Sequence, residues 1–195
     1  MKVLRREEYK VMPWKNGGGV TTEIWVWPPD SGVAGEPFDW RVSIADVATD
    51  GPFSKFSGYD RHIMLLEGEG MRLETDESGV IDLALHRPAA FSGDWTVSGK
   101  LIDGPVRDFN LMVARRFGRG SLACQRLTAP LALVGDGSVR LIHAIEGELS
   151  LGGHIIGEGE TAILTEMESG VLAPLEAEAL FALCRVRYQG QGPRM

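Results

Sequence analysis

The side chains of this chain that are best suited to hold a small molecule lie in residues 13–19, which read Pro-Trp-Lys-Asn-Gly-Gly-Gly. A tryptophan can cover a flat or apolar part of a ligand, a lysine can pair with its charge, and an asparagine both donates and accepts hydrogen bonds. Consecutive glycines are tolerated where the backbone needs unusual dihedral angles or approaches another group closely. The stretch therefore predicts a loop that lines a pocket; a tight bend with the tryptophan as a plug and the lysine in solvent is the alternative. The candidate ligand-binding residues of this loop are Trp14, Lys15, Asn16, Gly17 and Gly18.

Two stretches of alternating polar and apolar residues supply further candidates. In an extended strand, Arg41 and Ser43 share one face, opposite the apolar residues between them. In a later strand, Asp108 and Asn110 share a face in the same way. Such faces either line the interior of a cup or meet solvent, and alternation does not decide between the two.

Each of these polar residues has a possible ligand-binding role, and some have a structural one. Arg41 or Arg61 could pair with a ligand carboxylate through two parallel hydrogen bonds. Asn110, like the asparagine of the glycine loop, could meet an amide or formimino group. Arg61 could instead form a structural ion pair with Asp60, and Glu23 could brace the loop lysine or Arg41.

The motifs that metal or nucleophilic catalysis would need are missing. The chain has four histidines, no two of them closely spaced: His62, His86, His143 and His154. We therefore predict no metal site and no cofactor. Neither a nucleophile motif nor a phosphate-binding loop is present, and no catalytic residue is assigned. The two cysteines, Cys124 and Cys184, indicate buried thiols rather than a disulfide framework.

Short apolar runs and 25 glycines indicate that turns interrupt the chain often, and no helical period is evident. This pattern predicts an all-β sandwich or barrel, of which a jelly roll fits best. In the first half we expect strands at about 2–6, 21–27, 39–47, 61–67, 70–75, 80–85, 95–102 and 106–115. In the second half we expect them at about 121–127, 131–134, 138–145, 148–151, 154–156, 161–164 and 180–188.

An internal similarity predicts that the chain has two similar halves. The segment 65–73 resembles 144–151, since each has apolar residues, then Glu-Gly-Glu, then apolar residues again. A short joint at 117–120 separates the halves. The polar candidates lie in the first half, whereas apolar residues such as Leu133, Val134 and Ile155 indicate a closed core in the second.

Composition excludes several classes of partner. A net charge of -7 argues against a general nucleic-acid or anionic-membrane binder. The first residues lack the apolar region of a secretory signal, and no apolar run is long enough to span a bilayer. The expectation is a cytoplasmic protein that interacts with neither membranes nor nucleic acid.

Several motifs together resemble the HutD/Ves family of the cupin superfamily. Besides residues 13–23 they are Trp-Arg-Val-Ser-Ile-Ala at 40–45, Gly-Pro-Phe-Ser at 51–54, Asp-Arg at 60–61 and Asp-Phe-Asn-Leu-Met at 108–112. The resemblance implies a bicupin, two tandem cupin-type β-barrels in one chain that commonly forms a homodimer. Residues 1–118 would form the pocket-bearing barrel, 119–190 a supporting or dimer-forming barrel, and 191–195 a tail.

The resemblance also implies a ligand class. Family members encoded beside histidine-degradation enzymes are thought to bind an acidic intermediate, such as formylglutamate, formiminoglutamate or urocanate, and to moderate the pathway, while others are described as stress-related. The leading hypothesis is thus a non-enzymatic protein that senses or sequesters a small anionic metabolite. The alternative is a metal-independent hydrolase or isomerase that uses Glu23 or Asp108 as acid or base. A third possibility is a partner-binding module in which the glycine loop is an interface.

Overall fold

The computed structural model describes residues 1–14, 17–32 and 36–189, and its regular structure is almost entirely β-strand. The helical segment within these residues is the three-residue 3-10 helix η1 (Arg6–Glu8). The chain forms two compact units, which we call the first unit (Lys10–Gly120) and the second unit (Met1–Tyr9 with Ser121–Met195). The described part of the chain holds no helix long and apolar enough to cross a membrane. The predicted all-β class is confirmed.

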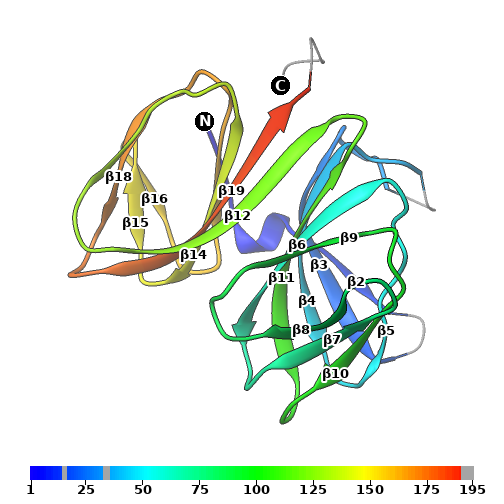
Figure 1. The fold of residues 1–195 in the computed structure, drawn as a ribbon. Helices are drawn as coiled ribbons and strands as arrows, with labels where there is room; N and C mark the ends of the chain where they lie inside the picture. The colour runs from blue at the N-terminus through cyan, green and yellow to red at the C-terminus, as the bar shows by residue number, and fades with distance from the viewer. Residues whose placement is uncertain (15–16, 33–35, 190–195) are drawn as a thin grey trace. The chain divides into compact units, whose positions relative to one another are not determined.

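The first unit consists of two antiparallel sheets (Figure 1). The six-stranded sheet has the order β2 (Lys10–Pro13), β3 (Gly19–Trp27), β4 (Trp40–Val47), β11 (Val106–Ala114), β6 (Tyr59–Glu67) and β9 (Ala89–Ser92). The four-stranded sheet has the order β5 (Gly51–Pro52), β10 (Val97–Leu101), β7 (Met71–Thr75) and β8 (Gly79–Leu83). Apolar side chains of both sheets, including Ile63, Leu65, Leu73 and Val97, meet in one core cluster.

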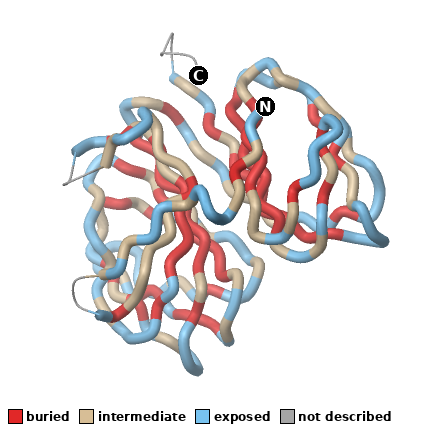
Figure 2. The backbone as a smooth tube through the Cα atoms, turned by 180° about the vertical axis from the view of Figure 1, so that it is seen from behind, coloured by how far each residue is buried: buried red, intermediate tan, exposed pale blue. Residues whose placement is uncertain are grey.

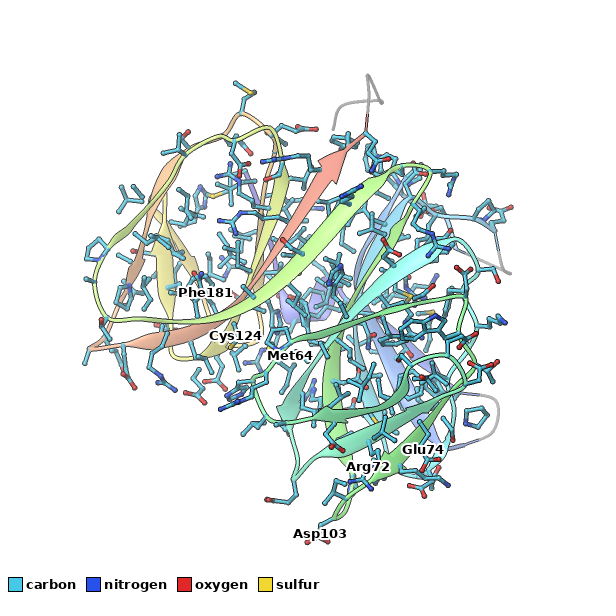
Figure 3. All side chains as sticks on the ribbon, viewed as in Figure 1. Met64, Arg72, Glu74, Asp103, Cys124 and Phe181 are labelled. Carbon is cyan, nitrogen blue, oxygen red and sulfur yellow. The ribbon has the colours of Figure 1, made fainter. Side chains whose placement is uncertain are left out.

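Alternation decides which side chains of this unit enter the interior. On β7, Met71 and Leu73 are buried, whereas Arg72 and Glu74 are exposed and lie at the outside of the unit (Figure 3). Arg72 Nε lies 2.9 Å from a carboxylate oxygen of Asp82 on the neighbouring strand. Because both side chains are largely in solvent, this ion pair contributes little to stability.

The second unit also has two sheets. The five-stranded sheet has the order β1 (Lys2–Leu4), β17 (Thr161–Leu164), β14 (Val139–Glu146), β19 (Ala179–Tyr188) and β12 (Gly118–Leu127). The four-stranded sheet has the order β13 (Leu131–Leu133), β18 (Gly170–Pro174), β15 (Leu149–Leu151) and β16 (His154–Ile156). Phe181 of β19 lies in the core cluster of this unit (Figure 3). Within each unit, buried residues concentrate in the middle strands (Figure 2).

The first residues of the chain depart from the expected division at 118. Strand β1 pairs with β17, and the Tyr9 hydroxyl lies 3.0 Å from the carbonyl oxygen of Gly159, to which it donates a hydrogen bond. Arg5 also forms an ion pair with Glu160. Residues 1–9 therefore belong to the second unit, because their hydrogen-bond partners lie there. The expected core of that unit also needs a correction, since Val134 and Ile155 are exposed.

Candidate functional site

A cavity of about 530 Å³ lies in the first unit and is lined by residues of both its sheets. Its volume is within the range of small-molecule sites. The six-stranded sheet contributes polar side chains from β4, β6 and β11, while the segment 49–56 contributes aromatic rings together with a few polar side chains. Of the candidates predicted from sequence, the structure brings to this cavity Trp14, Arg41, Ser43, Arg61 and Asn110.

Strand register explains why these polar residues meet. Asn110 of β11 lies opposite Ser43 of β4, and Asp108 lies two residues away on the same face. Met112 lies opposite Arg41 on one side and Arg61 on the other. The two polar faces that alternation left unassigned thus both point into the cavity rather than to solvent. A register irregularity between β11 and β6 falls next to Asp108, at a position where bulges commonly re-aim a side chain.

Arg61 is a buried cation without a carboxylate partner. Its side chain donates from Nη2 to Asn110 Oδ1 at 3.1 Å and from Nη1 to the carbonyl oxygen of Ser54 at 3.3 Å, and the residue is 5% exposed. Among the described residues no ion pair reaches it, and its Nε has no hydrogen-bond partner. Burial lowers the pKa of Arg61 to about 10, although the charge of Asp108 opposes that shift. A buried guanidinium with unused donors is a favourable place for an anion.

Aromatic rings surround this guanidinium. Its central carbon lies 4.9 Å from the ring centroid of Phe91, 5.2 Å from that of Phe53 and 5.6 Å from that of Phe56. Cation–π attraction offsets part of the desolvation of the charge. The rings also keep water away from it, which strengthens any interaction with a ligand carboxylate.

Asp108 is the buried carboxyl group of the cavity, 1% exposed. Its Oδ1 accepts a hydrogen bond from Asn110 Nδ2, whereas Oδ2 has no partner among the described residues. Burial raises the pKa of Asp108 to about 7; the Arg61 charge acts against the rise and the Asp46 charge adds to it. This carboxyl group therefore changes between its protonated and ionised forms near neutral pH.

Arg41 is already neutralised by the protein. Its Nε lies 2.7 Å from Glu23 Oε2, and both side chains are largely buried. Glu23 does not line the cavity. Of the roles left open for Glu23, the structure shows bracing of Arg41. A role of Glu23 in ligand binding or as acid or base stays a prediction.

The glycine loop places Trp14 at the wall of the cavity. The indole Nε1 donates to Thr21 Oγ1 at 2.8 Å, and the Trp14 amide donates to the carbonyl of Gly19 at 2.9 Å. Gly17 has a positive φ of 72°, and Gly18 accepts a hydrogen bond from the Ala48 amide at 3.0 Å. Neither Gly17 nor Gly18 lines this cavity, so their part is to shape the loop. Lys15 and Asn16, also predicted to bind ligand, lie outside the described residues.

Gly19 is required for the position of this wall, and replacing it by alanine tests that. An added Cβ would lie 2.4 Å from the carbonyl oxygen of Asp46 and 3.0 Å from the Trp14 ring. Because a backbone oxygen cannot move without moving β4, we expect Gly19→Ala to destabilise the first unit by about 1–3 kcal/mol. Tryptophan fluorescence during urea unfolding measures this, since all five tryptophans lie in that unit.

The matched control for this variant is Gly51→Ala. Gly51 lines the cavity, and its added Cβ would meet nothing within 4 Å. Its free energy of unfolding should stay within about 0.5 kcal/mol of the parent protein. Equal stability of the two variants would show that the close approach at Gly19 is unimportant.

Of the two roles left open for Arg61, the structure does not show the ion pair with Asp60. Asp60 Oδ1 instead lies 2.9 Å from Arg115 Nη1, on the exterior of the unit. The two neighbours in sequence point to opposite faces of β6, because side chains alternate along a strand. Arg61 therefore enters the cavity.

Several residues of the cavity were not assigned from the sequence, notably Thr21, Phe53, Phe56 and Met112. The pattern could have indicated Met112, which lies two residues beyond Asn110 on the same face. Gly99 of β10 makes room for Phe53, since its added Cβ would lie 2.7 Å from that ring. Nothing in the sequence brings the segment 49–56 to this place.

Within the described residues, no three His, Cys, Asp or Glu side chains are grouped as a metal site would require. His143 is buried, with its Nδ1 2.9 Å from Thr161 Oγ1 in the second unit. His62 lies in the first unit and does not line the cavity.

Each unit of this all-β chain has two antiparallel sheets, and solved structures of cupin-like fold superpose on the chain. Oxalate decarboxylase from Lactobacillus farciminis superposes with a TM-score of 0.72 over 95% of this chain and 86% of its own, at 7% identity, which shows the fold alone. The model of the HutD family matches residues 6–183, and the chain belongs to that family.

Relatives and solved structures agree with this assignment. An uncharacterised 21.2 kDa protein from the hutC 3' region of Pseudomonas putida is 47% identical over 122 residues, and protein Ves of Escherichia fergusonii is 43% identical over 100 residues. These matches span 63% and 51% of this chain, and 63% and 50% of the relatives, which is less than two thirds of their length. HutD from Pseudomonas fluorescens SBW25, solved in a formate condition, is 31% identical with a TM-score of 0.81, covering 97% of this chain and 99% of that one. A conserved protein of unknown function from Pseudomonas aeruginosa PAO1 is 36% identical with a TM-score of 0.84, covering 95% of this chain and 98% of that one.

Proposed function

We propose that this chain is a small-molecule-binding bicupin that senses or sequesters an acidic metabolite in the cavity of its first unit. The observation that carries the proposal is Arg61, a buried cation at the cavity wall that has no carboxylate partner within residues 1–14, 17–32 and 36–189. An uncompensated buried charge is costly, and a ligand carboxylate would remove that cost.

The other cavity residues suit a ligand that carries a neutral polar group beside its acid. Asn110 and Ser43 offer both donors and acceptors at the cavity floor. Trp14 offers an apolar face to a short carbon stem. N-formylglutamate, formiminoglutamate and urocanate each combine these groups. The name of the Pseudomonas putida relative, from a hutC region, favours this choice from histidine degradation.

The proposal includes two tandem cupin-type barrels, with the second unit in a supporting or dimer-forming role, and a homodimer in the cytoplasm. It is supported by the two-sheet construction of each unit and by the cupin-like neighbours. Moderation of the pathway would follow if binding lowers the free concentration of the metabolite.

Calorimetric titration at pH 6.5 with the three acids tests the proposal. At least one should bind with a dissociation constant at or below the millimolar range, because one buried charge-assisted pair and two neutral hydrogen bonds suffice for that affinity. A control ligand in which the carboxylates are replaced by amides should not bind. If none of the acids gives binding heat at millimolar concentration, the histidine-pathway ligand is wrong.

Asp108 favours a second candidate, a metal-independent hydrolase or isomerase. A cavity carboxyl group with a pKa of about 7 can act as general acid and base at neutral pH. The same acids incubated with the protein and followed by NMR decide this. Product formation that Asp108→Asn abolishes while binding persists would favour the enzyme over the sensor.

A further inference from the structure

We propose that Asp108 makes the cavity select for a ligand anion together with one proton: the carboxyl group is protonated while an anion occupies the cavity. The inference deepens the proposed function and rests on it for the location of the anion. In this role Asp108 controls the charge that the cavity offers to the anion, and it takes no part in a chemical reaction.

The geometry around Asp108 leaves one oxygen without a partner. Asn110 connects Asp108 to Arg61: its Nδ2 donates to Asp108 Oδ1, and its Oδ1 accepts from Arg61 Nη2 at 3.1 Å. This amide orientation leaves Asp108 Oδ2 with no partner among the described residues, although it is buried at the cavity wall. A buried carboxylate oxygen without a donor is costly, and a proton on it removes most of that cost.

The other charges near the cavity are paired among themselves. Arg41 pairs with Glu23 at 2.7 Å. Asp50 lies 3.5 Å from Lys100 Nζ, and its Oδ1 accepts from the Leu101 amide at 2.8 Å. Among the cavity-lining residues that the structure describes, the two remaining charges are those of Arg61 and Asp108.

The charges on the strands beside Asp108 do not supply a compensating cation either. Asp46 on β4 and Glu67 on β6 both pair with Arg107, at 3.5 Å and 3.4 Å. That arrangement is two acids to one base, so it adds negative potential near Asp108. The Asp46 charge accordingly raises the pKa of Asp108 further.

The charge balance then determines when an anion can bind. If Asp108 is ionised, it cancels the charge of Arg61, and the described part of the cavity wall has no net charge for a ligand. If Asp108 is protonated, the charge of Arg61 is available to the ligand carboxylate. Ionised ligand, ionised Asp108 and one proton from water therefore combine into a complex with a neutral carboxyl group, and nothing else is consumed.

Proton-linked calorimetry tests the inference. N-formyl-L-glutamate is titrated at pH 7 and at pH 8 in two buffers that differ in ionisation enthalpy. Because the pKa of free Asp108 is about 7, we expect uptake of about half a proton per ligand at pH 7 and more at pH 8. Asp108→Asn is permanently neutral, so it should bind without proton uptake and with an affinity that does not change between these pH values. The control Asp50→Asn removes another cavity carboxylate and should retain the uptake.

A second measurement does not depend on the identity of the ligand. The infrared carbonyl band of the protonated Asp108 is obtained as the difference between the parent protein and Asp108→Asn, with and without formate as the probe anion. The band disappears when Asp108 loses its proton. Bound formate should keep Asp108 protonated, so the band should persist to a higher pH with formate than without it. A shift with formate but no binding of N-formyl-L-glutamate supports the inference and contradicts only the proposed ligand. Binding of either anion without proton uptake, or a band that neither anion moves, overturns it.

Discussion

Replacing Arg61 by methionine is expected to weaken binding of the ligand acid at least about 100-fold, because the cavity loses the charged donor that no carboxylate of the described residues neutralises. Methionine has a similar length and can occupy the space among the rings of Phe53, Phe56 and Phe91. The free energy of unfolding should change by no more than about 1–2 kcal/mol, since removal of an unpaired buried charge offsets two lost hydrogen bonds. Calorimetry measures the first effect, and urea unfolding at pH 7 the second.

The matched control is Arg115→Met. Arg115 lies in the same unit and carries the same charge, but it pairs with Asp60 and Asp94 outside the cavity. Its replacement should leave the affinity unchanged. If Arg61→Met binds as well as the parent protein, or if both variants lose affinity equally, Arg61 is not the anion partner.

Much of the fold could be predicted from sequence because most strands show their burial pattern locally. The expected strand at 39–47 corresponds to β4 and the one at 106–115 to β11, each with its polar and apolar faces as the alternation predicts. The strands missed are short or lack alternation: β2, β5, β9 and β18. β5 has two residues, Gly51 and Pro52, and its strand character comes from pairing with β10 alone.

The direction of the polar faces could not be predicted, since it depends on what covers them. Arg41 and Ser43 would face solvent in a sheet with one open side. Here the four-stranded sheet and the segment 49–56 cover that face, through contacts between residues distant in sequence. The pairing of Arg41 with Glu23 likewise depends on a register irregularity in β3, near Glu23.

The structure decides which of the two cavity arginines is the better candidate to bind a ligand anion. The sequence offered both Arg41 and Arg61 as candidates and left Arg61 a structural alternative. Among the described residues, the structure gives Arg41 a carboxylate and leaves Arg61 without one. Residue types do not distinguish the two arginines; burial and partners do. Asp108 is a similar case. The sequence places it only on the polar face of a strand, whereas in the structure its burial raises its pKa to about 7.

The buried Asp108 should also make the first unit lose stability as pH rises, which is opposite to the usual behaviour of an aspartate. Its folded pKa of about 7 lies above the ordinary value of 3.8. The contribution is therefore fully present below 3.8 and is lost as pH rises through about 7, because ionisation is easier in the unfolded chain. Over about pH 5 to 9 the parent protein should lose roughly 3 kcal/mol relative to Asp108→Asn. Urea unfolding followed by tryptophan fluorescence, which reports the first unit, measures the difference at each pH.

The parent protein and Asp108→Asn are compared at every pH. The titration of all other groups affects both proteins equally, and the asparagine amide adds a cost that does not change with pH. Neither effect therefore alters how the difference in unfolding free energy varies with pH. Asp94→Asn provides a control of opposite sign. The Gly58 amide donates to Asp94 at 2.8 Å and lowers the pKa of that carboxyl group, so the stability that Asp94 contributes is lost as pH falls. A parallel pH dependence for the parent protein and Asp108→Asn would mean that Asp108 is ionised in the folded unit, and the cavity would then hold an Arg61–Asp108 pair with no net charge for an anion.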